Sequence, residues 1–370
     1  MRAWKIFQHG GPGELKRIEV EERKPGPREA RVQVRAVGLN HLDLWVCQGV
    51  PGHSCPLPLI LGSDVAGVVE SLGPLSDREG KALEKRGIRV GTRVVIDPML
   101  SCGACESCGE GFPPTCSSFG LLGEIRDGGC ADFLSVGTEN LIALPDSFDF
   151  RQAVCLPIPY ITAWSMLIRK ARLQAGELVL IQAGGSGVSV AAIQIAKLMG
   201  AVVITTVGSE EKAAKAQAQG ADYVINYRTD QTGRTGSADR AGAIREKVRE
   251  FARQWGKAGV DVVIDHVGKD TWTESLRCLA WGGRIVTCGA TTGGEINLDL
   301  KLLFFKNLSM LGATMGGRAD LPKIMTLVAQ GRLRGVVDSV FPMEGLPEAM
   351  NRLETRQVFG KVVVENGASH

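Results

Sequence analysis

The run ELVLIQAGGSGVSVAAIQIAKLMG, at residues 177–200, constrains the fold more than any other part of the chain. It joins a short apolar stretch, a glycine-rich turn and a segment with apolar residues at helical spacing that ends in glycine. Strand-like and helix-like patterns then alternate, as AVVITTV, SEEKAAKAQAQG, YVIN, AIREKVREFARQW, VDVVIDHV, TWTESLRCLAWGG and RIVTCG. This alternation predicts an α/β fold, with βαβ units that form a doubly wound parallel sheet.

The glycine-rich turn predicts an anion site. Glycines let the backbone approach a pyrophosphate, and the helix that follows supplies unpaired N–H groups. Ser189 and Val190 stand where the last glycine of G-x-G-x-x-G would fall, so the turn alone is also compatible with a purely structural role. The βα units behind it favour dinucleotide binding. We expect cofactor contacts from Gly184, Gly185, Ser186, Gly187 and Val188.

The end of the next strand indicates which dinucleotide is bound. An acidic residue there would favour NAD, because it would bond the ribose 2′-hydroxyl. The chain instead has Val207-Gly208-Ser209, with Lys212 one turn later and Tyr227 after the following strand. A small gap with Ser209, Lys212 and Tyr227 nearby predicts a 2′-phosphate site, and hence NADP(H). Glu210 and Glu211 point mildly towards NAD(H), unless they only favour the helix dipole.

Residues before this region show a different sequence pattern. Residues 1–150 carry short β-prone runs between turns that contain Pro and Gly, which predicts a β-rich domain. Residues 76–87 are charged and poorly periodic and are interpreted as a solvated loop, and residues 228–242 as an exposed insertion. We expect domains at 1–152 and 153–316, with 317–370 returning to the first domain through the strand GKVVV. Lys361 in that strand is interpreted as solvated, with contact to the adenosine phosphate as the alternative.

Four of the ten cysteines lie within fifteen positions. Cys102, Cys105, Cys108 and Cys116 follow a C-x2-C-x2-C-x7-C spacing. Four thiolates without an open coordination position predict one structural Zn²⁺ in a lobe near 100–118. Disulfides or an empty reduced loop are the alternatives, although disulfides across such short loops would be strained.

Composition indicates which classes of partner are not expected and in which cellular compartment the chain resides. The net charge is +3 and no dense basic block is present, so nucleic acid is not expected as a partner. The long apolar stretch 188–207 is interrupted by polar residues, so it is interpreted as a helix and a strand and not as a membrane span. The six other cysteines are scattered, which favours a reducing cytoplasm over a disulfide framework.

Several segments together resemble the medium-chain dehydrogenase/reductase superfamily: VGLNHLDLW (37–45), LPLILGSDVAGVVESLG (57–73), the cysteine lobe and AGGSGVSVAAIQIAKLMGA (183–201). The resemblance covers nearly the whole chain. It implies a GroES-like β-rich catalytic domain with a structural zinc lobe, and a Rossmann domain. It also implies a small-molecule substrate and a homodimer or homotetramer, and LSMLGATM (308–315) is either an edge strand or an interior one.

The departures from this family are informative. Zinc alcohol dehydrogenases of the superfamily carry cysteine where this chain has Asn40, a His-Glu pair where it has Ser63-Asp64, and a third ligand near Ile158. Such a set cannot provide a tetrahedral catalytic zinc, and Asn40 resembles the metal-free quinone oxidoreductase branch. A zinc site rebuilt from other residues is the alternative: Cys47, His53, Cys55, Asp64 and Cys155. The resemblance adds cofactor contacts from Thr162, Val267, Gly268, Gly289 and Ala290.

These observations lead to a functional hypothesis. Without a Lewis acid, hydride addition to a quinone or a polarised C=C is easier than alcohol oxidation, because the resulting oxyanion needs only hydrogen-bond donors. We expect an NADPH-dependent quinone or enone reductase with Asn40 and Ser63 as donors and Asp43 as orienter or proton relay. Asn40 and Asp43 are equally compatible with a turn-forming role. The alternatives are an atypical zinc-dependent alcohol dehydrogenase and a non-catalytic NADPH-binding regulatory protein. His266 is interpreted as a satisfied strand-end residue, with a catalytic base as the alternative.

Overall fold

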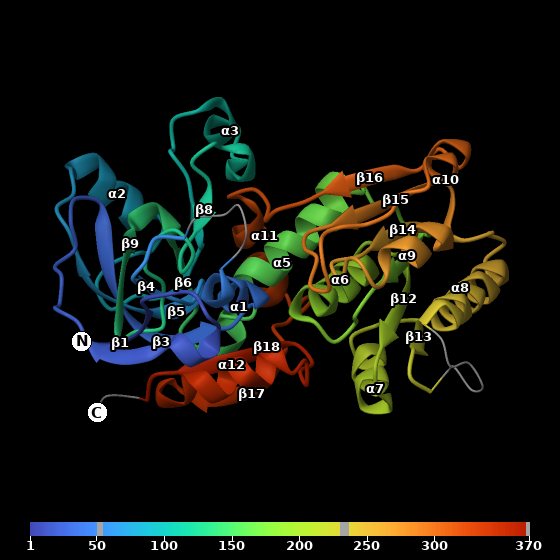
Figure 1. The fold of residues 1–370 in the computed structure, drawn as a ribbon. Coiled ribbons are helices and arrows are strands. Elements are labelled where there is room, and N and C mark those ends of the chain that lie inside the picture. Colours follow the sequence, from blue (N-terminus) through green and yellow to red (C-terminus); the bar gives the residue numbers. More distant parts are fainter. Residues whose placement is uncertain (50–54, 230–236, 368–370) are drawn as a thin grey trace. The chain divides into compact units, whose positions relative to one another are not determined.

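The computed structural model describes residues 1–49, 55–229 and 237–367, and the side chains of 237–241 are not described. The chain divides into two compact units (Figure 1). Unit 1 comprises Met1–Ile158 and Gly317–His370, and unit 2 comprises Pro159–Gly316.

Unit 1 is built on a seven-stranded sheet in the order β10-β6-β5-β3-β18-β17, with β9 paired to β3. The bounds of these strands are β3 Glu29–Gly38, β5 Asp64–Leu72, β6 Arg93–Ile96, β9 Phe133–Gly137, β10 Leu141–Ala143, β17 Val337–Pro342 and β18 Lys361–Glu365. The C-terminal strand β18 pairs antiparallel with β3, with Val364 opposite Val37. A smaller sheet pairs β1 (Arg2–Ile6) with β2 (Lys16–Glu19) and β4 (Leu59–Ile60).

Alternation of buried and exposed residues sets the orientation of these strands. Along β3, Ala30, Val32, Val34 and Ala36 are buried, while the residues between them are partly exposed. This two-residue period is that of a strand with one face on the core. Helix α12 (Leu346–Glu354) adds its apolar face to that core through Leu346, Ala349, Met350 and Leu353.

The interpretation of residues 76–87 as a solvated loop is wrong, because Asp77–Lys85 form helix α2. Its start is a capping box: Ser76 Oγ accepts from the N–H of Glu79, and the Glu79 carboxylate accepts from the N–H of Ser76. Leu83 alone among the residues of α2 is buried. One apolar anchor in nine residues is too little to register as periodicity, whereas the capping box was readable from the sequence.

Unit 2 contains a fully parallel six-stranded sheet in the order β13-β12-β11-β14-β15-β16 (Figure 1). The strands are β11 Leu178–Ile181, β12 Val202–Val207, β13 Tyr223–Asn226, β14 Val260–Ile264, β15 Leu279–Thr287 and β16 Ser309–Gly312. Helices α6 (Gly187–Leu198), α7 (Glu210–Ala218), α8 (Ser237–Gln254) and α9 (Trp272–Cys278) connect successive strands. The strand order reverses between β11 and β14, so the predicted doubly wound Rossmann topology is confirmed.

Two boundaries in unit 2 differ from the predicted ones. Helix α8 begins at Ser237, inside the segment expected as an insertion, and residues 230–236 of that segment lie outside the described residues. Strand β15 begins at Leu279, inside a stretch expected to be helical, because Leu279 pairs with Val260. Within the described residues, no helix is both long enough and apolar enough to cross a membrane.

Candidate functional site

The glycine-rich turn in unit 2 joins β11 to α6. Ala183 adopts a left-handed backbone (φ 53°), a strained conformation for a residue with a Cβ that is found mostly at functional turns. Gly184 N–H donates to Thr206 O, and a Cβ on Gly184 would lie 2.4 Å from Thr205 Oγ1. Only glycine therefore allows this close approach. Gly185 lies in the same turn, Ser186 caps α6, and Gly187 and Val188 are its first residues.

The other predicted cofactor residues of unit 2 follow neighbouring strands at the same edge of the sheet. Val267 and Gly268 follow β14, and their N–H groups donate to the buried carboxylate of Asp265 at 2.9 and 3.2 Å. Gly289 and Ala290 follow β15, and a Cβ on Gly268 would lie 3.1 Å from Ala290 Cβ. The two strand ends therefore touch. The carboxyl ends of parallel strands are where ligands bind in sheets of this kind.

Thr162 is placed differently. It lies in helix α5 (Pro157–Trp164), and its buried hydroxyl donates to Met315 Sδ at 3.5 Å. The hydroxyl therefore has an internal partner within unit 2, and its predicted contact with a cofactor stays a prediction.

The residues predicted to hold a 2′-phosphate gather at the ends of β12 and β13. Ser209 caps α7, with its Oγ accepting from Lys212 N–H at 3.2 Å. Tyr227 N–H donates to Val207 O, and a Cβ on Gly208 would lie 2.6 Å from Tyr227 Oη. The Tyr227 hydroxyl therefore lies against Gly208, the neighbour of Ser209. This proximity is needed if Tyr227 and Ser209 are to contact the same phosphate.

Both nearby carboxylates are engaged elsewhere. Glu210 accepts from Asn226 Nδ2 at 2.5 Å and from Thr229 Oγ1 at 3.0 Å. Glu211 pairs with Lys215 at 2.6 Å, one helical turn along α7. The two residues that pointed to NAD(H) thus have partners in their own helix, at the end of β13 and just after it.

A buried polar cluster in unit 1 consists of Asn40, Asp64 and Lys361. The Lys361 ammonium lies 2.8 Å from Asp64 Oδ2 and 2.7 Å from Asn40 Oδ1, and only 4% of the lysine is exposed. Asn40 Nδ2 donates to Asp64 Oδ2 at 3.0 Å and to Gly38 O at 3.3 Å. The remaining oxygen, Asp64 Oδ1, accepts from Ile158 N–H at 2.9 Å. Every polar atom of the Asn40 side chain therefore has a partner, either in the cluster or at Gly38 O.

The expectation for Lys361 as a solvated or phosphate-binding residue is wrong. Lys361 is the first residue of β18, which lies between β3 and β17 in the sheet, so its side chain is enclosed. A buried ammonium requires a carboxylate partner, which Asp64 supplies. Two of the three ammonium hydrogens have partners among the described residues, so one remains for a further acceptor.

Asp43 and Ser63 flank this cluster. Asp43 accepts from Asn40 N–H at 2.7 Å and from Gly62 N–H at 3.0 Å, and so fixes both neighbouring segments. Burial raises the pKa of Asp43 to about 6, against the opposing effect of these hydrogen bonds and of Lys361. Ser63 Oγ is buried, and no hydrogen-bond partner for it is found among the described residues. An unsatisfied buried hydroxyl is uncommon and marks a place for a polar ligand or water.

The positions that would carry a catalytic zinc do not fit one. The side-chain oxygens of Asn40 and Asp64, which could act as metal ligands, already accept hydrogen bonds from Lys361. The positive charge of Lys361 also repels a metal cation. Burial raises the pKa of both Cys47 and Cys155 to about 12, and neither thiol lies in a group of three possible ligands among the described residues. His53, a member of the alternative set, lies outside the described residues. Across the described chain, only the cysteine lobe brings together three or more possible metal ligands from His, Cys, Asp and Glu.

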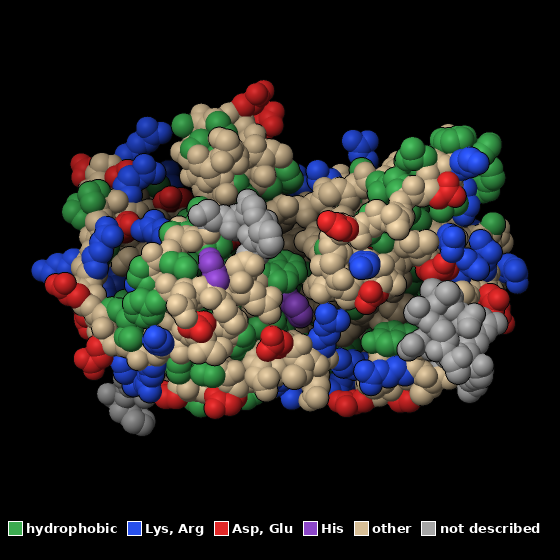
Figure 2. All heavy atoms as spheres, viewed as in Figure 1, with side chains coloured by type: hydrophobic (Ala, Val, Ile, Leu, Met, Phe, Trp, Pro, Cys, Tyr) green, Lys and Arg blue, Asp and Glu red, His purple; other side chains and the backbone are tan. Residues whose placement is uncertain are grey.

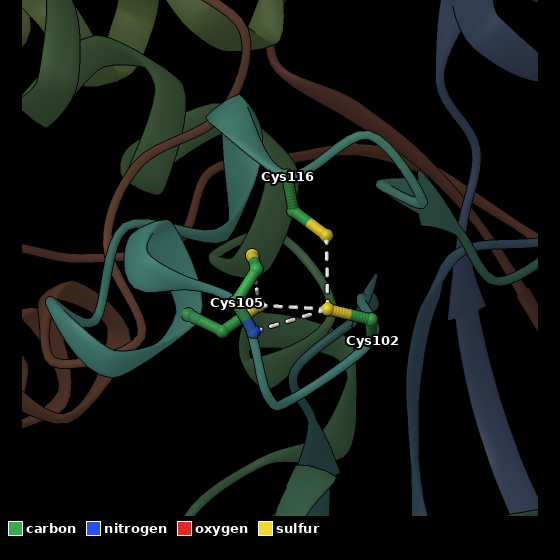
Figure 3. A group of neighbouring side chains, drawn as sticks. Cys102, Cys105 and Cys116 are labelled. Atoms are coloured by element: carbon green, nitrogen blue, oxygen red, sulfur yellow. Dashed lines mark hydrogen bonds between the residues drawn. The ribbon is translucent and has the colours of Figure 1, made fainter.

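The cysteine lobe fits a zinc ion. The four Sγ atoms lie within 4.8 Å of one another, with separations of 3.9 Å (Cys102–Cys108), 3.6 Å (Cys105–Cys108) and 3.5 Å (Cys102–Cys116) (Figure 3). A tetrahedral site with Zn–S bonds of about 2.3 Å requires S···S distances of about 3.8 Å. The separations are far too long for disulfide bonds. The N–H groups of Ala104 and Cys105 lower the pKa of the Cys102 thiol, whereas hydrogen bonds with the neighbouring thiols raise the pKa of Cys105, so the four sulfur atoms titrate as one group.

Comparisons with known proteins agree with this architecture. Residues 26–146 match the family model "Alcohol dehydrogenase GroES-like domain" and residues 187–330 match "Zinc-binding dehydrogenase". The chain is 30% identical to acryloyl-coenzyme A reductase of Sulfurisphaera tokodaii, over 94% of this chain and 95% of that protein. It is 31% identical to a quinone oxidoreductase of Pseudomonas aeruginosa, over 96% and 97%. A crystal structure of an NAD-dependent alcohol dehydrogenase is 40% identical and superposes with a TM-score of 0.88, over 99% and 100%.

Proposed function

Because this chain belongs to the medium-chain dehydrogenase/reductase superfamily and is therefore an oxidoreductase, we propose that it uses NADPH to reduce quinones or α,β-unsaturated carbonyl compounds without a catalytic zinc. One observation carries the proposal. Two of the positions that are expected to hold catalytic zinc in the zinc-dependent branch, Asn40 and Asp64, are bonded here to each other and to the Lys361 ammonium.

The residues of the cluster suit the reduction of a conjugated carbonyl. A bound nicotinamide would supply hydride to the carbon, and the charge that develops on the oxygen would need donors placed in advance. The third ammonium hydrogen of Lys361 and the Ser63 hydroxyl are the donors that the cluster leaves available. Asn40 would act by holding Lys361 and Asp64 in place, because both of its amide hydrogens are committed. Asp43 would hold the Asn40 and Gly62 backbone.

The names of two relatives support this substrate class. Acryloyl-coenzyme A carries a C=C conjugated to a thioester carbonyl, and a quinone carries the same conjugated unit in a ring. Both reactions deliver hydride to a polarised system whose product oxygen needs hydrogen-bond donors. The 40% identical neighbour bears the name of an NAD-dependent alcohol dehydrogenase, which makes that activity the competing hypothesis.

The test combines zinc counting with turnover. Native mass spectrometry should give one zinc per chain, held by the cysteine lobe, and NADPH oxidation by a quinone or an enone should survive a chelator that does not unfold the protein. Two zinc ions together with chelator-sensitive alcohol oxidation would establish the alcohol dehydrogenase instead. Tight NADPH binding without turnover across quinones, enones and carbonyls would establish a regulatory protein.

Substitution of Lys212 tests the proposed preference for NADPH over NADH. Lys212→Glu should raise the KM for NADPH by about 10- to 100-fold, because a charge-assisted contact to the 2′-phosphate contributes roughly 1.5–3 kcal/mol. The KM for NADH should change less than threefold. Lys215→Glu, with the same charge change one turn along α7, is the matched control and should leave the NADPH preference intact. Equal losses for both cofactors would contradict the 2′-phosphate site.

We also propose that unit 2 forms the contact of a homo-oligomer. Strand β16 is the last strand of its sheet, and four large apolar residues of unit 2 are each at least 60% exposed: Trp281, Leu300, Phe304 and Phe305. Hydrophobic side chains gather over α10 (Leu300–Phe305) in Figure 2. Such a patch beside a sheet edge marks an interaction site.

Light scattering measures the assembly directly. The double variant Trp281→Glu/Phe304→Glu should reduce the wild-type oligomer to monomers, because two buried carboxylates would oppose the interface. Trp255→Glu changes another exposed tryptophan of unit 2 and should leave the assembly unchanged. An unaltered mass for the double variant would place the subunit contact elsewhere.

A further inference from the structure

We propose that His266 is a positioning residue that keeps the Ser186 hydroxyl available for the pyrophosphate of the dinucleotide. The inference rests on the proposed dinucleotide site and assigns it a residue that no glycine-rich motif contains. His266 follows β14, whereas Ser186 lies in the turn after β11, so the contact joins two separate strand ends of unit 2.

The geometry ties the imidazole to the start of α6. His266 is 9% exposed, and its Nε2 lies 2.8 Å from Ser189 Oγ and 3.0 Å from Ser186 Oγ. Ser186 is the N-cap of this twelve-residue helix and accepts the Ser189 N–H at 3.1 Å. A histidine side chain therefore contacts both hydroxyls of the helix turn whose free N–H groups and dipole would receive an anion.

The hydrogen positions determine what each group can do. Ser189 Oγ lies 2.7 Å from Gln182 O, and a carbonyl can only accept, so the Ser189 hydroxyl hydrogen is used there. At 2.8 Å from Ser189 Oγ, the imidazole can then donate, and the proposal places the hydrogen on His266 Nε2. Ser189 Oγ thus receives a hydrogen bond from His266 in addition to any from Ser186, whose Oγ lies 3.0 Å away.

This arrangement gives the Ser186 hydroxyl two states. Without a ligand, its hydrogen can donate to Ser189 Oγ. When a phosphate oxygen arrives, the hydrogen can turn to it, because His266 continues to supply Ser189 Oγ. Without the imidazole, Ser186 would have to leave the buried Ser189 Oγ without a side-chain donor in order to bind the phosphate. Such a loss reduces affinity.

The imidazole is suited to this task as a neutral donor. Burial lowers the pKa of His266, against the opposing charge of Asp265. The Asp265 carboxylate is itself held by the hydroxyls of Thr271 and Ser275 and by two backbone N–H groups, so the strand end that carries His266 is fixed. A fixed neutral donor costs little reorganisation when the ligand binds.

Fluorescence titration of NADPH and NADH, without substrate, tests the proposal independently of turnover. His266→Leu should weaken both dinucleotides by about tenfold and by equal factors, because the pyrophosphate is common to both. His266→Gln, whose amide can place a donor near Nε2, should bind within about threefold of wild type. His266→Asn is too short to reach and should resemble His266→Leu, which provides a second polar variant if the leucine variant fails to fold.

A double-variant cycle separates positioning from a structural role. Ser186→Ala should weaken binding by itself, and adding His266→Leu to it should cost less than twofold, because the hydroxyl that His266 serves is gone. Fully additive losses would overturn the proposal, as would wild-type affinity in His266→Leu. Nitrogen-15 chemical shifts of the imidazole should show the Nε2–H tautomer, and a Nδ1–H tautomer would equally overturn it. If wild-type protein binds neither dinucleotide, the proposed function fails instead.

Discussion

Lys361→Met is expected to lower the free energy of unfolding of unit 1 by about 3–5 kcal/mol, because it leaves Asp64 as an unpaired carboxylate in the interior. Asp64 is fully buried and Lys361 is its only salt-bridge partner among the described residues. Asn40 would also lose the ammonium that its carbonyl oxygen accepts from. Denaturant unfolding, followed by a signal specific to unit 1, measures the loss.

Two further variants show whether the loss comes from the buried charge. Lys323→Met removes an exposed lysine of α11 (Asp320–Ala329) in the same unit and should change stability by less than about 0.5 kcal/mol. Asp64→Asn/Lys361→Met removes both charges and should recover most of the loss, since the amide oxygen introduced at position 64 can still accept the Ile158 N–H. If the double variant is no more stable than Lys361→Met, the ion pair is not the cause.

Turnover separates the catalytic role from the structural one. The double variant should fold but reduce a quinone or an enone at least tenfold more slowly than wild type, because the ammonium donor is missing. The Kd for NADPH, measured without substrate, should be unchanged. Wild-type turnover in this variant would remove Lys361 from the proposed mechanism while leaving its structural role intact.

The elements of unit 2 were predictable because each carries a strong local signal. Strand β11 is a continuous apolar run, and β12 and β14 are runs of valine and isoleucine interrupted only by threonines and by Asp261, as is typical of strands buried on both faces. The topology followed from the alternation, since parallel neighbours need a crossover helix. The start of α8 was missed because its first turn, SADRAG, has the composition of a loop.

The polar cluster of unit 1 was harder to foresee, because its members are 321 positions apart in sequence. The resemblance drew attention to Asn40 and Ser63-Asp64, but it left the partner of the buried acid unnamed. A usable signal existed: Lys361 directly precedes three consecutive valines, a run typical of an interior strand, where a charge must be paired. His266 followed the same pattern, because its contacts with Ser186 and Ser189 depend on strands that are adjacent only in the folded sheet.

The cysteine lobe provides the second large effect. Cys105→Ser is expected to reduce the bound zinc from one ion per chain to none, because three thiolates and a hydroxyl hold zinc far more weakly than four thiolates. Native mass spectrometry measures the occupancy. Cys288→Ser changes a cysteine outside the lobe and should keep the full zinc content.

Loss of the zinc ion should lower the local stability of the lobe and of the segment that Arg318 connects to it. Arg318, just after the boundary between the units, donates its N–H to Gly111 O at 3.0 Å and its guanidinium to Ser101 Oγ at 3.1 Å. In Cys105→Ser, hydrogen exchange should therefore rise by more than tenfold in residues 100–118 and, through Arg318, in residues 317–320, while β11 to β14 keep their protection. Exchange that rises equally throughout unit 2 would show that the zinc stabilises the whole chain. Unchanged exchange at 317–320 would show that the lobe and Arg318 are not coupled.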